Sequence, residues 1–216
     1  MFVHYRSPGI IFKKEDRAEA DQLFTVYTKD FGKLEILGKA IRKISSKLRS
    51  GAEIFYLSEI EFIQGKAHKT LTDAILIEKF ENLKNNLNKL KIAYKVSQVL
   101  NNLVSGQEPD EKIWQLLEET FRKLDKLEIG RHPPTTLRKL EIIYYYFFWN
   151  LVSLLGYQPE LKGCTIQGKK INCDIAKIIK VILRKDWQIL PRLKLEPSHL
   201  KLLKNVSKCY RIKICG

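Results

Sequence analysis

The chain has 216 residues, and 44% of them are hydrophobic, so it can bury one large core or two to three small ones. Its 39 Lys and Arg residues outnumber 24 Asp and Glu, which gives a formal net charge of +15 at pH 7. With 29% charged residues, 11 Gly and 7 Pro, it is neither a disordered tract nor a fibrous repeat. Since it has neither an apolar run of roughly 20 residues nor a signal-peptide pattern, we expect a cytoplasmic protein with no membrane partner.

The excess of basic residues is uneven along the chain. Residues 157–216 carry 14 basic and 4 acidic residues, whereas residues 1–78 carry 13 and 11. This balance is typical of proteins that bind polyanions, because each phosphate neutralised by a cation releases counterions. The other interpretation is that the lysines only keep the protein in solution. On charge and clustering, the sequence favours nucleic acid as the partner.

The first 78 residues have the pattern of short β-strands. Five segments are rich in β-branched or aromatic residues and are separated by polar or glycine-containing turns. They cover residues 9–14, 23–28, 34–37, 54–62 and 71–77. Because there is no room for crossover helices between them, we expect a five-stranded antiparallel barrel at residues 1–78. An SH3-like barrel is the main structural alternative.

From residue 79 onward the hydrophobic spacing changes to that of helices. Apolar residues recur every three or four positions over 83–103, 113–127 and 137–155. Asp110 stands where an N-cap is expected, directly before the second of these segments. A loop and two short basic helices complete the tail. The chain is therefore predicted to be α+β, with a barrel domain at 1–78 and a helical domain with a short basic tail at 79–216.

A cluster of cations follows the third predicted strand. Residues 38–49 hold five basic and no acidic residues, where a barrel presents a loop or short helix beside its open face. Two nearby aromatic residues could stack on bases, a contact that tolerates any base sequence. The alternative is a solvated loop with Tyr27 packed inside the barrel. The candidate nucleic-acid site comprises Lys39, Arg42, Lys43, Lys47, Arg49, Tyr27 and Phe31.

The four cysteines do not show the spacing of a zinc site. Cys164 and Cys173 are nine residues apart, and Cys209 and Cys215 are six apart. Structural zinc sites typically contain Cys-x2–4-Cys pairs. Four cysteines in a chain of this length also do not make a disulfide framework. We therefore expect no zinc and no other cofactor.

No sequence motif indicates catalysis. The chain lacks a phosphate-binding glycine-rich loop, a His-Glu-x-x-His motif and a G-x-S-x-G motif. Its four histidines are scattered, and no carboxylates are grouped as a metal-dependent nuclease would need. We expect that the protein is not an enzyme.

Several segments, in this order, resemble the RecO family of bacterial recombination mediators. The first is Tyr5-Arg-Ser-Pro-Gly-Ile-Ile, and the third is Phe24-Thr-Val-Tyr-Thr-Lys-Asp-Phe-Gly-Lys33. Gly38-Lys-Ala-Ile-Arg-Lys43 is similar to the family's basic signature after the third strand. Residues 17–21 also match the family. Residues 100–124 resemble its helical hairpin, and residues 154–164 resemble the entry to its zinc-finger loop.

The resemblance implies an N-terminal OB-fold and a central helical domain. It implies binding of single- and double-stranded DNA, annealing of complementary strands, and contact with single-strand-binding protein and RecR to help load RecA. No nucleotide hydrolysis is implied. Many members carry two Cys-x2-Cys pairs, but position 167 here is Gln where the partner of Cys164 would fall. We therefore expect a degenerate zinc-finger-like loop around 157–175.

The same resemblance implies a pocket for the tail of single-strand-binding protein, which is acidic and ends in a hydrophobic residue. Such a pocket needs apolar walls and a cation at its rim. The third predicted helix has more aromatic residues than one core stripe requires. The alternative is that these aromatic residues form a core. The candidate partner-peptide pocket comprises Arg138, Lys139, Tyr145 and Trp149.

Three other functions stay open on the sequence. The first is an OB or SH3-like barrel that binds RNA or ribosomal surfaces. The second is a metal-dependent nuclease, and the third is a scaffold for partners whose basic charge only aids solubility. A preference for structured RNA would indicate the RNA-binding barrel, and metal-dependent cleavage of DNA would indicate the nuclease. Binding without salt dependence would indicate the scaffold.

Overall fold

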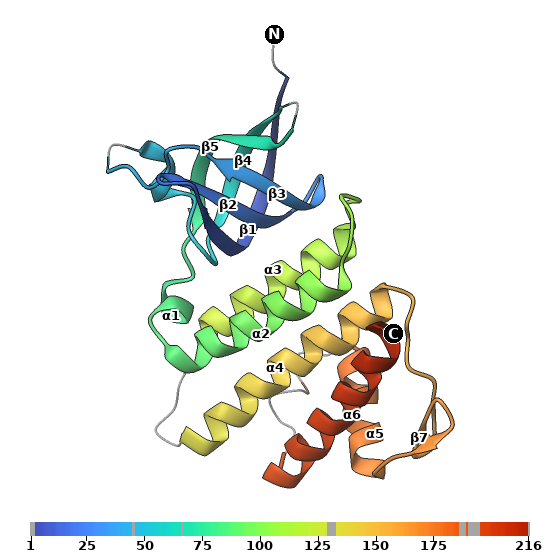
Figure 1. Cartoon of the computed structure of the whole chain (residues 1–216). Helices are drawn as coiled ribbons and strands as arrows, with labels where there is room; N and C mark the ends of the chain where they lie inside the picture. The colour runs from blue at the N-terminus through green and yellow to red at the C-terminus, as the bar shows by residue number, and fades with distance from the viewer. Residues whose placement is uncertain are drawn as a thin grey trace. The chain divides into compact units, whose positions relative to one another are not determined.

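The computed structural model describes residues 3–44, 46–65, 67–128, 133–185, 189 and 195–215. The chain forms two compact units, Met1–Asp125 and Lys126–Gly216 (Figure 1). In the described ranges, no helix combines the length and the apolar character needed to cross a membrane.

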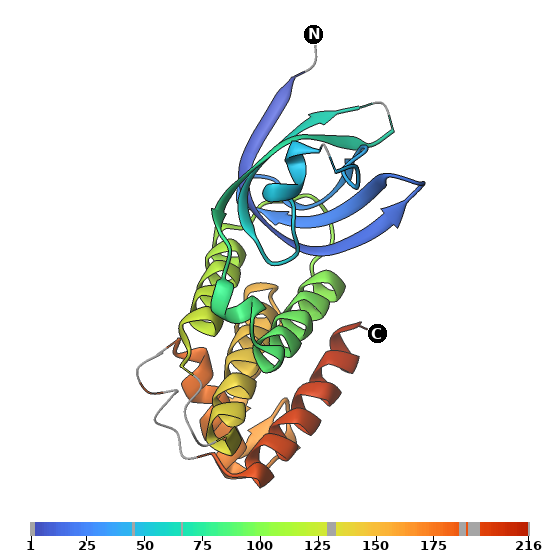
Figure 2. The same cartoon turned by 90° about the vertical axis from the view of Figure 1, so that its left-hand side faces the viewer.

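A closed five-stranded barrel forms the first part of the first unit (Figures 1 and 2). Around the ring, the strands follow the order β1-β2-β3-β5-β4, and the long strand β1 pairs with both β2 and β4. This order, with a short helix between β3 and β4, is that of an OB-fold, so the expected barrel is confirmed. The strands are β1 (His4–Arg17), β2 (Asp21–Thr28), β3 (Gly32–Gly38), β4 (Leu57–Gln64) and β5 (Lys69–Glu78).

The prediction of a purely antiparallel barrel was wrong at one seam. β3 and β5 run parallel, and Ile36 pairs there with Lys69 and Leu37 with Thr70. The other four seams are antiparallel. A closed ring with an odd number of strands cannot alternate direction at every seam, so one parallel pair is required. The barrel is therefore mixed.

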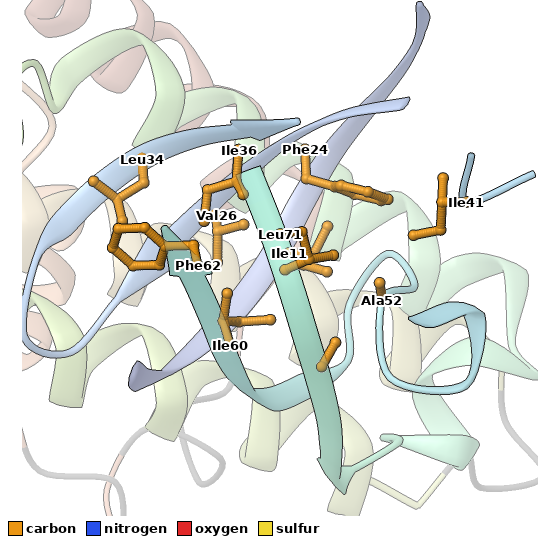
Figure 3. Packing of buried hydrophobic residues seen from close by; sticks show 11 residues of the cluster. Ile11, Phe24, Val26, Leu34, Ile36, Ile41, Ala52, Ile60, Phe62 and Leu71 are labelled. Carbon is orange, nitrogen blue, oxygen red and sulfur yellow. The ribbon is translucent and has the colours of Figure 1, made fainter. Parts of the chain in front are cut away.

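Alternating side chains of the strands fill the barrel (Figure 3). Phe24 and Val26 of β2 meet Ile60 and Phe62 of β4 in one cluster of buried residues. The connection between β3 and β4 adds Ile41 and Ala52 to this cluster, and Leu48 of the short helix η1 (Lys47–Ser50) packs against it. The connection thus closes the barrel core instead of extending into solvent.

Three helices complete the first unit: α1 (Glu81–Lys84), α2 (Leu87–Leu103) and α3 (Glu111–Lys126). The backbone N–H groups of Lys112 and Ile113 donate to the Asp110 carboxylate, which confirms the predicted N-cap. Phe121 of α3 contacts both Phe55 and Phe80, at ring-centroid distances of 5.6 and 5.8 Å. The last barrel strand ends at Glu78, and this aromatic packing extends the compact unit through α3.

In its described residues, the second unit has three helices and a small sheet. Buried aromatic residues of α4 form its core, among them Tyr146, Phe147 and Trp149. Asn150 donates hydrogen bonds to the backbone oxygens of Tyr146 and of Ile182 on α5, which ties these two helices together. The tail is longer than expected, because α6 has 19 residues. The elements are α4 (Pro133–Leu154), β6 (Leu161–Lys162), β7 (Thr165–Ile166), β8 (Lys169–Lys170), α5 (Cys173–Leu183) and α6 (Pro197–Cys215).

Glu61 on β4 makes barrel stability sensitive to acid. Its carboxylate accepts hydrogen bonds from Arg6 (2.5 Å), His4 (2.9 Å) and Thr72 (3.0 Å), and these bonds lower its pKa to about 2. A pKa below the ordinary 4.5 means that the ionised form adds stability above pH 4.5, and that this stability is lost as the pH falls towards 2. We expect Glu61→Gln to flatten this acid dependence in urea unfolding. An unchanged slope of the free energy of unfolding against pH would contradict this role of Glu61.

Candidate nucleic-acid interface

The segment with the predicted cations is fixed to the barrel through its backbone. The N–H of Ala40 donates to the Asp21 carboxylate at 2.7 Å, and the N–H of Arg42 donates to the oxygen of Ala20 at 3.0 Å. Ile41 between them is buried in the barrel core. The surrounding side chains therefore project outward from a fixed backbone, and all five predicted cations are exposed: Lys39, Arg42, Lys43, Lys47 and Arg49.

A polar hollow of about 430 Å³ lies beside these cations, and Arg42 and Arg49 line it. Lys14 of β1 and Gln22 of β2 line it too, although both are distant from this segment in sequence. Arg42 pairs with Asp16 at 3.5 Å, an exposed contact that a phosphate can replace at small cost. Sequence analysis missed Lys14 and Gln22, because only strand pairing brings them to the segment.

Glu53 also lines this hollow, and it accepts a hydrogen bond from Lys14 at 2.6 Å. Burial acts to raise its pKa, but the bonds from Lys14 and the Ile54 N–H lower the pKa below its usual value. The ionised carboxylate thus pairs with Lys14, as Asp16 pairs with Arg42.

The two aromatic residues predicted to stack on bases do not join the cations. Tyr27 is fully buried, and burial, followed by the nearby charge of Asp110, raises its pKa to about 12. Phe31 is half-buried in the turn between β2 and β3, where its ring contacts those of Tyr5 and Phe62. The basic segment begins beyond the other end of β3. The stacking prediction is corrected for Tyr27, because both faces of β2 are covered there.

The predicted peptide pocket on α4 is also corrected. Tyr145 and Trp149 are 3% and 0% exposed, so neither ring forms the wall of an open pocket. Trp149 packs instead against Phe148 and against Tyr210 of α6, with ring centroids 5.1 and 4.9 Å apart. Arg138 donates to the backbone oxygen of Leu195 at 2.9 Å, and Lys139 is half-exposed. These aromatic residues belong to the core.

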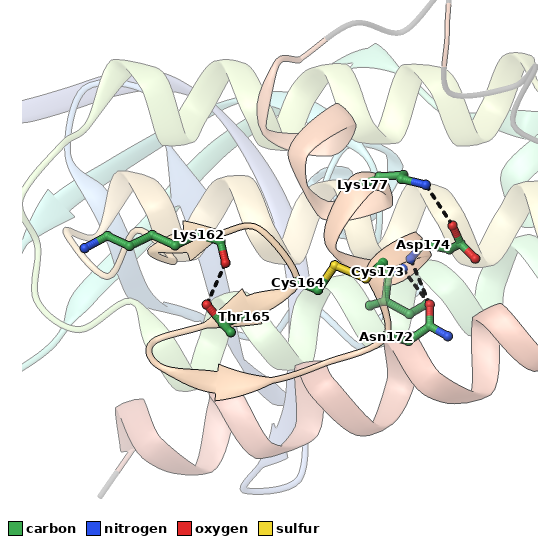
Figure 4. The surroundings of a disulfide bond; sticks show 8 residues. Lys162, Cys164, Thr165, Asn172, Cys173, Asp174 and Lys177 are labelled. Carbon is green, nitrogen blue, oxygen red and sulfur yellow. Dashed lines mark hydrogen bonds and ion pairs between the residues drawn. A yellow bond between two sulfur atoms is a disulfide. The ribbon is translucent and has the colours of Figure 1, made fainter.

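Two of the four cysteines form a disulfide. Cys164 and Cys173 are bonded and join the small sheet β6-β7-β8 to the first turn of α5 (Figure 4). Asn172 caps α5 directly beside the bond by accepting from the N–H groups of Asp174 and Ile175. Cys209 is free and exposed, and the side chain of Cys215 lies outside the described residues. In the part of the chain that is described, no three His, Cys, Asp or Glu side chains converge as metal ligands.

Comparisons with known proteins agree with this architecture. The family model "Recombination protein O N terminal" matches residues 1–80, and "Recombination protein O C terminal" matches residues 84–176. The chain is 30% identical over 171 residues to the DNA repair protein RecO of Dehalococcoides mccartyi strain BAV1, covering 79% of this chain and 64% of that protein.

Two other relatives with the same name give similar values. The Acetivibrio thermocellus protein is 27% identical over 168 residues, 78% of this chain and 63% of its own length. The Rubrobacter xylanophilus protein is 32% identical over 164 residues, 76% of this chain and 62% of its own length. The chain thus spans less than two thirds of the relatives that it matches. With both family models aligned in order over the barrel and the following helices, the chain belongs to the RecO family.

Proposed function

We propose that this chain acts in DNA repair and recombination by binding single- and double-stranded DNA at the barrel and annealing complementary strands. The observation that carries the proposal is the backbone-fixed segment after β3, which presents five exposed cations beside a polar hollow. The name of these relatives, DNA repair protein RecO, supports the same process.

The proposed mechanism is neutralisation of charge and involves no catalytic step. Cations on one face gather two phosphate backbones and reduce their mutual repulsion, so the bases stay free to pair. By family resemblance, the proposal includes single-strand-binding protein and RecR as partners and help in loading RecA. It includes no metal and no cofactor.

Reversing three cations of the segment tests the DNA site. The triple variant Lys39→Glu, Arg42→Glu, Lys43→Glu should bind single-stranded DNA roughly 100-fold more weakly at moderate salt, since each lost phosphate contact removes a counterion-release contribution. The slope of log affinity against log salt should become shallower by about 0.7 for each lost contact. Fluorescence anisotropy of a labelled oligonucleotide measures both.

A matched control reverses Lys79, Lys91 and Lys112, which are exposed in the same unit and lie outside the segment. It changes net charge equally and should lose much less affinity. An equal loss of DNA affinity in the two triple variants would contradict the assignment of the DNA site to the segment after β3. Accelerated annealing of strands coated with single-strand-binding protein tests the mediator role, and tighter binding to structured RNA than to DNA would support the RNA-binding alternative.

A further inference from the structure

A second hollow lies between β1 and α2, inside the first unit. Its volume is about 400 Å³, and its apolar part is made by Phe12 and Ile54. Lys13 and Lys14 line it from β1. Lys14 also lines the polar hollow beside the cationic segment, so the two hollows adjoin at this residue.

The face of α2 that lines this hollow is polar over two turns. Tyr94, Ser97, Gln98, Asn101 and Asn102 all line it, and positions 94, 97, 98, 101 and 102 fall on one side of a helix. Of these five residues only Ser97 is buried, whereas Tyr94, Gln98 and Asn102 are exposed and Asn101 is half-buried. Their polar groups are therefore open to a ligand that enters the hollow.

These polar groups lack protein partners. Among the described residues, the side chains of Gln98, Asn101 and Asn102 make no hydrogen bond within the protein. Ser97 is only 4% exposed, and its hydroxyl has no partner either. A buried hydroxyl without a partner costs stability, and a polar group of a ligand in the hollow would remove that cost.

An aromatic ring stands beside these groups. Tyr94 is 48% exposed, and an edge-to-face contact with Phe55, with centroids 4.9 Å apart, fixes its orientation. An exposed ring that is held in place, next to side-chain amides, has the chemistry that recognises a nucleobase. The ring stacks on the base, and Asn or Gln pairs with the donors and acceptors at its edge.

We propose that the hollow between β1 and α2 binds a nucleobase of single-stranded DNA whose phosphates lie on the cationic segment. The inference rests on the proposed function and adds the recognition of bases to it. Lys13 and Lys14 line the hollow, and each is paired with a carboxylate, Glu15 at 2.9 Å and Glu53 at 2.6 Å, in a partly exposed contact that a phosphate can replace.

The test compares two strands of equal length and charge at the same salt concentration. One is oligodeoxyadenylate, and the other is an abasic strand with the same sugar-phosphate backbone. The full chain should bind the strand with bases about 5- to 100-fold more tightly. Tyr94→Leu and Asn101→Leu should each reduce this preference several-fold and leave affinity for the abasic strand unchanged.

Two variants serve as controls. Asn88→Leu makes the same substitution at an exposed position of α2 that does not line the hollow, and it should keep the preference. Ser97→Ala removes an unpaired hydroxyl and should fold normally, with a weaker preference for bases. Titration with adenosine monophosphate distinguishes a base in a strand from a free nucleotide, because the strand should bind much more tightly.

The outcomes separate this inference from the proposed function. Equal affinity for the two strands, or a full preference in both Tyr94→Leu and Asn101→Leu, would overturn the base site alone. If adenosine monophosphate binds as tightly as oligodeoxyadenylate, the ligand of the hollow is a free nucleotide and not a base of a DNA strand. Failure of the chain to bind either strand would overturn the DNA-binding function together with the site.

Discussion

Trp149→Ala should lower the free energy of unfolding by about 3–5 kcal/mol, the usual cost of truncating a large buried aromatic residue. Trp149 is fully buried between Phe148 and Tyr210, so the substitution removes contacts between α4 and α6 and leaves a cavity. Urea unfolding followed by circular dichroism measures the loss. The size of the effect distinguishes a core residue from one that lines a partner pocket.

Two further variants sharpen this result. Trp149→Phe should recover most of the stability, since the indole N–H has no partner among the described residues and only the packing is needed. Leu137→Ala, at a position of α4 that is 43% exposed, should change stability by less than about 1 kcal/mol. If Trp149→Ala unfolds like the unmodified chain, the core assignment is wrong and the peptide pocket regains support.

Gly51→Ala should lower the free energy of unfolding by about 3 kcal/mol, at the upper end of the cost of overpacking. A Cβ at Gly51 would overlap the backbone oxygen of Ala74 on β5. Ala74 is held in register with Ile60 of β4, and the Gly51 oxygen accepts a hydrogen bond from the buried Ser58 at 2.7 Å. Neither the segment at Gly51 nor strand β5 can move without loosening the barrel.

The same substitution should also weaken DNA binding, because η1 ends at Ser50 and carries Lys47 and Arg49. Thermal unfolding and oligonucleotide anisotropy on the same samples measure both effects. Ser46→Ala, directly before η1 and without a side-chain capping hydrogen bond, is the control and should change stability by about 0.5 kcal/mol or less. Wild-type stability of Gly51→Ala would show that the loop moves freely and is not fixed against β5.

Local pattern was sufficient to predict the barrel strands and the helices α2, α3 and α4, but not the small sheet β6-β7-β8 or the length of α6. Alternation and turn residues located the five strands, and Asp110 was identified as an N-cap because capping depends on neighbours in sequence. The parallel seam at Ile36 and Leu37 escaped prediction, since it follows from closure of the ring and not from any strand alone.

The candidate site was only partly predictable, for a related reason. The cations after β3 form one continuous segment, so the sequence identified them together. The position of Tyr27 depends on what covers the outer face of β2, and Lys14 reaches the hollow only through strand pairing. The polar face of α2 is visible as a helical pattern, but its significance depends on Ser97 being buried without a partner. The Cys164–Cys173 bond was not predicted either, because it depends on the turn that brings the two cysteines together.

Closure of the barrel limits how other chains can attach to it. β1 is hydrogen-bonded to β2 along Gly9–Arg17 and to β4 along His4–Ile10, and the β3–β5 seam pairs only two residues of each strand. Addition of a strand is therefore confined to β3 and β5 beyond this seam and to the ends of β1, and contacts elsewhere on the barrel must use side chains or loops. In the small sheet β6-β7-β8, one outer strand consists of Lys169 and Lys170, whose charges oppose edge-to-edge pairing.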